Sequence, residues 1–95
     1  MLHTFSHSPY QTDIDALLDS LGAGDALLLL QDGVIAALGA ASVLSRLQQS
    51  GARVYALQSD IDARGLGNQI STEIQLIDYT EFVQLTVKHA RQLAW

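Results

Sequence analysis

The sequence predicts an α/β protein, a three-layer α/β/α sandwich around a mostly parallel sheet of about four to five strands. Two observations lead to this prediction. Apolar runs of strand length alternate four times with segments that carry apolar residues at helical spacing. The run Ala26–Leu30 is wholly apolar, which is typical of a strand covered on both faces of a parallel sheet. A chain of 95 residues suits one domain, so we expect residues 1–95 to form a single unit.

The first thirty residues predict a strand, a helix and a second strand, which is the leucine run itself. Residues 1–5 form the first strand, which stops before Pro9 because proline cannot donate to a sheet ladder. The helix is capped by Thr12 or Asp13, and the glycines after its last leucine end it. Its buried stripe has the spacing i, i+3, i+4 and i+7. The members of this stripe are Ile14, Leu17, Leu18 and Leu21.

A longer helix is predicted after the leucine run. Residues 31–33 turn the chain, and residues 34–50 then show helical periodicity, with Gly39 as a weak point. Gly51 is a natural residue to follow the end of such a helix. The face that we expect to be buried contains Val34, Ala37, Leu38, Ala41 and Leu44.

The last part of the chain predicts two more strands and a final helix. The strands are residues 53–57 and 74–77, with a short helix over residues 60–64 between them. Asp78 and Glu81 are spaced as a helix N-cap and its capping-box partner, so the final helix begins there. Its expected buried face contains Tyr79, Phe82, Val83, Thr86, Val87 and Ala90.

The composition excludes several classes of function. The chain has no cysteine, which rules out disulfides, cysteine-ligated metal sites and a cysteine nucleophile. Five Lys and Arg residues face ten Asp and Glu residues and do not cluster, so direct nucleic-acid binding is not expected. The first residues lack the pattern of a signal peptide, and Gln31 and Asp32 interrupt the longest apolar stretch. We therefore expect a cytoplasmic protein without a membrane span.

Polar residues occur at the expected carboxyl ends of the strands, where open parallel sheets bind ligands. His3 and His7 lack a third ligand at a fixed spacing, so no metal site is predicted. Asp32 is interpreted as a helix cap. Asp60 follows a strand, as a phospho-accepting aspartate does, but the acidic pair that would hold a divalent cation is missing. No catalytic residue, metal ligand or cofactor is therefore predicted.

Surplus apolar surface is the feature that points to a partner. Only 16% of the residues are charged, compared with about 25% in average soluble domains. Several apolar residues lie off the predicted buried stripes or at the end of the chain, and we expect them to contribute to an interface. These interface candidates are Ile35, Val43, Leu85 and Trp95.

A series of short motifs runs over the whole chain. In order they are Leu2-His-Thr, His7-Ser-Pro9, the segment 24–34, Val54-Tyr-Ala-Leu57, Asp62-Ala-Arg-Gly-Leu66, the segment 77–83, the segment 85–89 and Trp95. In order, spacing and total length they resemble the DsrH branch of the DsrE/DsrF/DsrH family.

The resemblance implies a non-catalytic subunit of a TusBCD-like sulfurtransferase complex. TusC-like and TusD-like subunits would be its partners in a heterohexamer, which relays persulfide sulfur for 2-thiolation of the wobble uridine of tRNA. The family's sulfur-carrying cysteine belongs to the TusD-like subunit, and each handover needs a thiolate. Because this chain has no cysteine, no carrier residue can be transferred onto it.

The residues themselves leave two alternatives open. An enzyme or small-ligand-binding domain would use the strand ends near residues 6–8 and Asp32, and it predicts a deep polar pocket there. A self-assembling structural subunit predicts a stable homo-oligomer that forms without partners.

Overall fold

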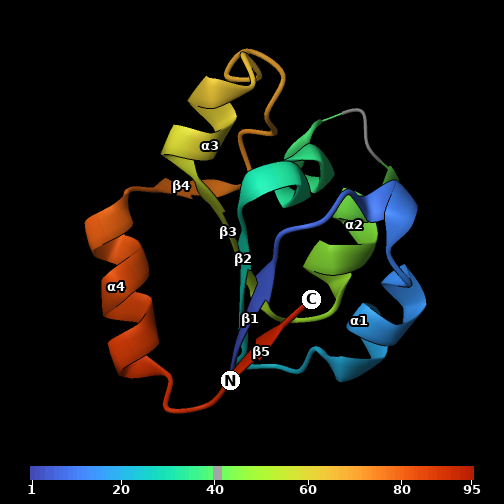
Figure 1. The fold of residues 1–95 in the computed structure, drawn as a ribbon. Coiled ribbons are helices and arrows are strands. Elements are labelled where there is room, and N and C mark those ends of the chain that lie inside the picture. Colours follow the sequence, from blue (N-terminus) through green and yellow to red (C-terminus); the bar gives the residue numbers. More distant parts are fainter. Residues whose placement is uncertain (40–41) are drawn as a thin grey trace.

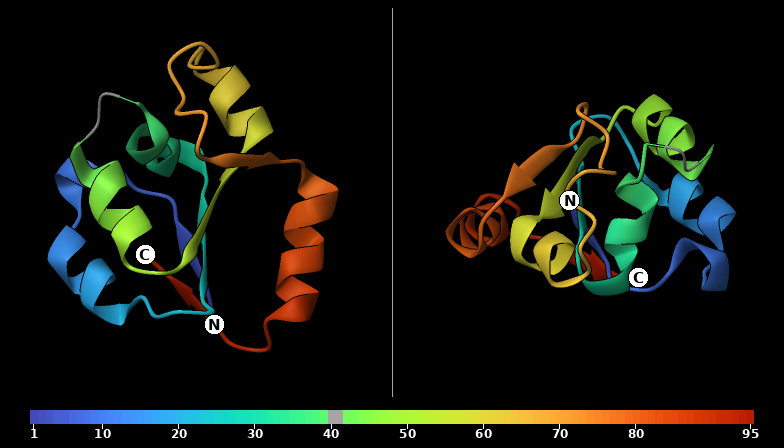
Figure 2. Two further views of the ribbon diagram at one scale, coloured as in Figure 1. Left: turned by 180° about the vertical axis from the view of Figure 1, so that it is seen from behind. Right: turned by 90° about the horizontal axis from the view of Figure 1, so that it is seen from above.

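A computed structural model describes residues 1–39 and 42–95. Within these residues, five parallel strands form one sheet in the order β4-β3-β2-β1-β5 (Figure 1). The strands are β1 (Leu2–Phe5), β2 (Ala26–Leu29), β3 (Arg53–Leu57), β4 (Gln75–Ile77) and β5 (Gln92–Ala94). The α-helices are α1 (Ile14–Ser20), α2 (Ser42–Gln49), α3 (Gln58–Ala63) and α4 (Tyr79–Lys88), and the 3₁₀ helices are η1 (Pro9–Gln11) and η2 (Gln31–Ala37). Helices α1 and α2 lie on one side of the sheet and α4 on the other, which confirms the predicted α/β class (Figures 1 and 2).

The core has two parts, one on each face of the sheet. Successive side chains of a strand point to opposite faces, so Phe5, Leu27 and Leu29 pack with residues of α1, α2 and η2. Leu28 belongs to the other part, which packs against α4. All four residues of β2 are buried. The prediction that the leucine run is covered on both faces is therefore confirmed.

The helix predicted over residues 34–50 is wrong in its first half. The chain instead forms η2, leaves helical structure at Leu38, and enters α2 at Ser42. Leu38 forms an antiparallel bridge with Ile70, and the Gly39 N–H donates to the Gln69 carbonyl oxygen at 2.9 Å. These contacts with a distant segment replace the hydrogen bonds of a continuous helix. Ala41, expected on the buried face, lies outside the described residues.

The predicted inner face of α4 is wrong in part. Tyr79, Val83 and Val87 have exposed fractions of 68%, 45% and 81%. The sheet packs against Phe82, as predicted, and also against Leu85, which the pattern places away from the core. The helix carries two apolar stripes, and the sheet packs against the one that contains Phe82 and Leu85, both of which stay half-buried. The other stripe stays open to solvent.

Gly33 marks a close approach between η2 and the end of β1. A Cβ atom at this position would lie 1.9 Å from the Phe5 carbonyl oxygen and 2.7 Å from its carbonyl carbon. Both are backbone atoms of a buried strand, so no side-chain movement can make room. Glycine is therefore required here because of space.

Candidate functional site

The acidic residues at the carboxyl ends of β2 and β3 form hydrogen bonds with other groups of the protein. The Asp32 carboxylate accepts a hydrogen bond from the Arg64 guanidinium at 3.1 Å, so the prediction that Asp32 caps a helix is wrong. The cap comes from Asp60, whose carboxylate accepts the Gln31 N–H at 2.7 Å. Arg64 also donates to the Asp60 carbonyl oxygen at 3.2 Å. This network connects α3 to η2. It engages both carboxylates that an active site at the carboxyl ends of these strands would need.

The residues that follow β1 bind the end of the chain. The carbonyl oxygen of Trp95 accepts hydrogen bonds from the Ser6 N–H at 3.2 Å and from His7 Nδ1 at 3.1 Å. The Ser8 hydroxyl accepts the Tyr10 N–H at 3.3 Å and begins η1. The groups on which the enzymatic alternative rested therefore have structural partners.

His3 is fully buried in β1 and has a partner on each ring nitrogen. The Trp95 indole N–H donates to His3 Nδ1 at 3.1 Å. An indole can only donate, so Nδ1 is the acceptor and the ring proton lies on Nε2. Nε2 in turn donates to the Asp25 carboxylate at 3.1 Å. Since both nitrogens are occupied, His3 has no lone pair left for a metal ion.

Asp25 collects three donors at the start of β2. Besides His3, its carboxylate accepts from the N-terminal ammonium of Met1 and from the Gly22 N–H, each at 3.1 Å. The ammonium, and then the His3 hydrogen bond, hold the pKa of Asp25 below its ordinary value, against a smaller opposing effect of burial. The cluster connects β1, β2 and Trp95. Its role is to stabilise the fold.

The four interface candidates from the sequence lie on different elements. Val43 of α2 and Trp95 pack at the margin of the same core cluster, Leu85 of α4 packs against the other cluster, and Ile35 is half-buried on η2. The structure does not gather all four into one patch. Their role at an interface stays a prediction.

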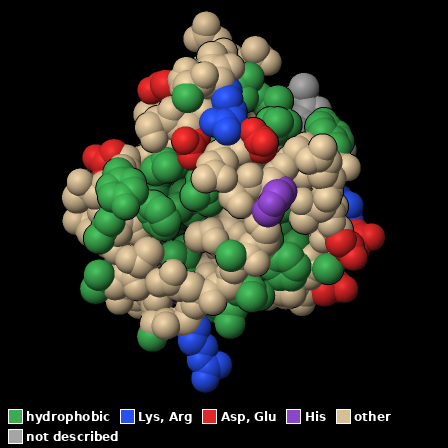
Figure 3. All heavy atoms as spheres, in the orientation of Figure 1, with side chains coloured by type: hydrophobic (Ala, Val, Ile, Leu, Met, Phe, Trp, Pro, Cys, Tyr) green, Lys and Arg blue, Asp and Glu red, His purple; other side chains and the backbone are tan. Residues whose placement is uncertain are grey.

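The helix α4 offers a more exposed apolar surface, at positions that the sequence pattern predicts to be buried. Tyr79, Val83 and Val87 follow the spacing i, i+4 and i+8 and form a stripe that we call the α4 outer stripe. No residue of α4 is buried. Apolar side chains gather over this helix in the space-filling view (Figure 3). The signal in the sequence was Leu85, which marks a second apolar stripe on the same helix.

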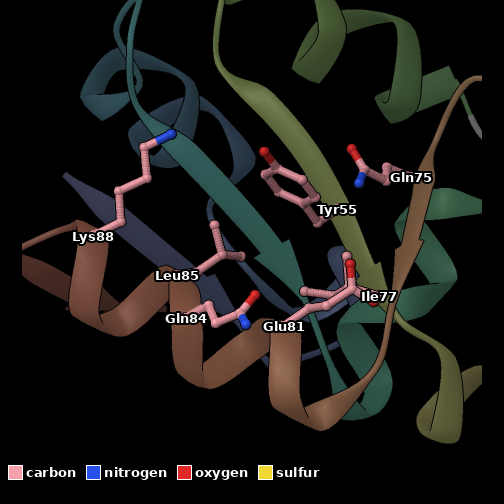
Figure 4. A pocket seen from close by; sticks show the side chains of 7 residues that line it. All are labelled: Tyr55, Gln75, Ile77, Glu81, Gln84, Leu85 and Lys88. Atoms are coloured by element: carbon pink, nitrogen blue, oxygen red, sulfur yellow. The ribbon is translucent and has the colours of Figure 1, made fainter.

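A pocket of about 210 Å³ lies between α4, the edge strand β4 and its neighbour β3. Leu85 points from α4 toward the sheet, and Tyr55 points from β3 into the same space (Figure 4). The other lining residues are Gln75, Ile77, Glu81, Gln84 and Lys88. This pocket lies on the α4 side of the sheet edge, away from the acidic rim described above.

Residues 1–39 and 42–95 contain neither a metal-binding cluster nor a membrane-spanning helix. No group of three or more His, Asp or Glu side chains is arranged to hold a metal ion. None of the helices in these ranges combines the length and apolar character required to cross a bilayer.

The chain matches the family profile described as "DsrH like protein" over residues 7–92. Among curated proteins, it is 58% identical to Protein TusB of Pectobacterium parmentieri over 95 residues, which is 100% of each chain. It is 57% identical to Protein TusB of Escherichia coli strain K12, again over 95 residues and 100% of each chain.

Two solved structures share the fold. The solution NMR structure of protein Tm0979 from Thermotoga maritima has a TM-score of 0.67 and 28% identity, and the match covers 96% of this chain and 97% of that one. Protein MTH1491 of unknown function from Methanobacterium thermoautotrophicum has a TM-score of 0.64 over 99% of this chain and 96% of that one. Its identity is 12%, so this second likeness concerns the fold alone.

Proposed function

The chain belongs to the DsrH-like protein family, and we propose that it is a cytoplasmic, single-domain, non-catalytic subunit of a TusBCD-like sulfur-relay complex. The complex would pass persulfide sulfur toward 2-thiolation of the wobble uridine of tRNA. The observation that carries this proposal is the 57–58% identity, over the whole of both chains, to proteins named TusB.

The proposed role is to hold TusC-like and TusD-like partner subunits in a heterohexamer. A persulfide relay requires a thiolate at every handover. This chain has no cysteine and therefore provides no carrier atom. Its contribution would be to position the partner subunit whose cysteine carries the sulfur.

The α4 outer stripe is the surface that we propose for partner contact. Its three side chains are among the exposed large apolar residues, and Tyr79 packs edge-on against Phe82 with ring centroids 5.8 Å apart. The helix is therefore apolar both on the side that faces the sheet and on the outer stripe. Helices with two apolar sides are typically buried in an assembly. Covering an exposed aromatic ring and two valines with a partner removes apolar area from water and favours association.

The residues singled out from the sequence are proposed as marginal contacts of such interfaces. Each keeps part of its surface accessible, and three of them also pack against the core, namely Val43, Leu85 and Trp95. These residues are Ile35, Val43, Leu85 and Trp95.

Co-expression with the TusC-like and TusD-like proteins of the same cell, followed by size-exclusion chromatography, tests the assembly. We expect one heteromeric peak that contains all three chains. A chain that never co-elutes with either partner would contradict the proposal. A stable homo-oligomer without partners would support the structural alternative instead.

Substitutions on α4 test the surface separately from the assembly. Val87→Glu places a charge in the proposed contact and should weaken partner binding by about tenfold or more, because the charge must be desolvated without a counter-ion. Tyr10→Glu is the matched control, since Tyr10 is 82% exposed and lies on η1. Equal binding by both variants would exclude the α4 outer stripe as the contact.

Function is tested by complementation. The chain should restore 2-thiouridine in tRNA of a TusB-deficient Escherichia coli strain, measured by mass spectrometry of digested tRNA. Val87→Glu should restore less of the modification than Tyr10→Glu at equal protein level. If the unsubstituted chain is expressed normally and restores no 2-thiouridine, the proposed role in tRNA thiolation is contradicted.

A further inference from the structure

The strand β4 forms one outer edge of the sheet. It pairs with β3, and within residues 1–39 and 42–95 no strand pairs with its other side. Its three residues, Gln75, Leu76 and Ile77, include neither proline nor a charged side chain. Natural proteins usually protect exposed edges with such residues, because free backbone N–H and C=O groups attract further strands. This edge is therefore chemically open to an additional strand.

The pocket beside this edge is built partly by β4 itself. Gln75 pairs with Tyr55 and Ile77 pairs with Leu57, so Gln75 and Ile77 share the sheet face that α4 covers. Both line the pocket with Tyr55 (Figure 4). An extended segment that pairs with the free side of β4 would project every second side chain over the same sheet face. Those side chains would arrive beside Gln75 and Ile77, which line the pocket.

The lining determines what the pocket can accept. The ring of Tyr55 and the side chains of Ile77 and Leu85 provide apolar contacts. Lys88 provides a cation, and no ion pair of Lys88 is found in the described part of the chain. The Glu81 carboxylate is already used, because it accepts the N–H at the start of α4 in the capping box. An apolar side chain accompanied by an acidic group matches this arrangement.

The size of the pocket favours a side chain over a small molecule. Its volume is about 210 Å³. Pockets for drug-sized ligands and cofactors usually measure about 300–1,000 Å³. A pocket below that range, next to an open strand edge, is typical of recognition by strand addition, where the backbone gives affinity and the pocket gives specificity.

We propose that β4 and this pocket bind an extended segment of a partner subunit, which adds a strand beside β4, inserts one apolar side chain and pairs an acidic group with Lys88. This inference rests on the proposed function, since the segment belongs to a TusC-like or TusD-like partner. The pocket shares α4 with the outer stripe, so a subunit held at the stripe is already close to the edge.

A second copy of this chain is a poorer occupant. The strand β4 has three residues, which span only about 10 Å. Pairing two such strands buries far less than the ~1,200 Å² of a stable interface. A segment of a subunit already bound through another surface needs no such area of its own, because its second contact is intramolecular.

Amide hydrogen exchange in the co-purified complex tests the proposal. We expect the β4 amides that point away from β3 to exchange at least about tenfold more slowly in the complex than in the free chain. If the complex forms and these amides exchange at the same rate as in the free chain, the inference is overturned while the proposed function stands. If no complex forms, both are overturned. Concentration-dependent protection in the isolated chain would identify a second copy as the occupant and also count against the proposal.

Charge reversal provides a second, independent readout. Lys88→Glu should weaken the complex by about tenfold, because the acidic group of the segment then meets a like charge. Arg91→Glu is the matched control, since Arg91 is an exposed cation that does not line the pocket. Both residues are exposed, so neither change should disturb the fold. An equal effect of the two variants would exclude an acidic group at Lys88.

Discussion

The substitution Trp95→Phe isolates one buried hydrogen bond. It removes the indole N–H that donates to His3 Nδ1 at 3.1 Å and keeps an aromatic ring. His3 has no exposed surface, so water cannot replace the lost donor. An unsatisfied buried acceptor costs about 1–3 kcal/mol, and the smaller ring loses a little apolar contact in addition. We therefore expect the free energy of unfolding to fall by about 1–3 kcal/mol, or by roughly 4–8 °C in Tm for each kcal/mol.

The assay is urea unfolding followed by far-ultraviolet circular dichroism, because Trp95 is the only tryptophan and its fluorescence disappears in the variant. Tyr10→Phe is the control, since it also removes a polar hydrogen from an aromatic ring but at a side chain that is 82% exposed. It should change stability by less than about 0.5 kcal/mol.

A double-mutant cycle with His3→Leu checks the assignment of the bond. Once His3 is replaced, Trp95→Phe should cost about 1 kcal/mol less than in the wild-type background, because no acceptor remains to be stranded. A Trp95→Phe variant as stable as Tyr10→Phe, with no coupling to His3, would refute the claim that the indole satisfies the buried imidazole.

Three further predictions concern the fold. Gly33→Ala should destabilise the protein by on the order of 3 kcal/mol or more, measured by urea unfolding, since the new methyl group collides with the Phe5 carbonyl; full stability would contradict the close approach. The pKa of Asp25 is lowered in the folded state, so its contribution to the free energy of unfolding is complete above about pH 4 and is lost as the pH falls through the folded-state pKa. The stability difference between wild type and Asp25→Asn should therefore shrink in acid, and a difference that stays constant with pH would contradict this linkage. Asp78→Ala removes the carboxylate that accepts the Glu81 N–H at 2.8 Å and should cost about 0.5–2 kcal/mol in thermal unfolding, whereas no loss would show that the capping box is dispensable.

Local sequence signals predicted the strands in the middle of the sheet well, because their apolar composition by itself favours a buried position. The leucine run of β2 cannot face water on either side, and the Asp78 cap has the expected partner. The short strand β5 gave no comparable signal. All three of its residues are exposed, and its formation depends on pairing with β1 rather than on its own pattern.

The predictions that failed concern positions whose structure depends on contacts with residues distant in the sequence. Helical periodicity continues through Leu38, yet a bridge to Ile70 diverts the backbone there. On α4, both apolar stripes satisfy the spacing of a buried helix, and only the sheet decides that Phe82 is inside and Val87 outside. The open α4 outer stripe and the pocket at β4 are for this reason features that the sequence pattern alone could not locate.

The pairing of β5 with β1 has a consequence for the order of folding. Leu2 pairs with Gln92 and Thr4 with Ala94, so the two ends of the chain must meet before this ladder exists. Contacts at such separation form late, and a three-residue strand without a buried residue opens at low cost. Whenever β5 detaches, β1 becomes a bare edge of the sheet. We expect aggregation to begin from this frayed state, so its rate should follow the strength of the His3–Trp95 hydrogen bond more closely than the global stability of the domain.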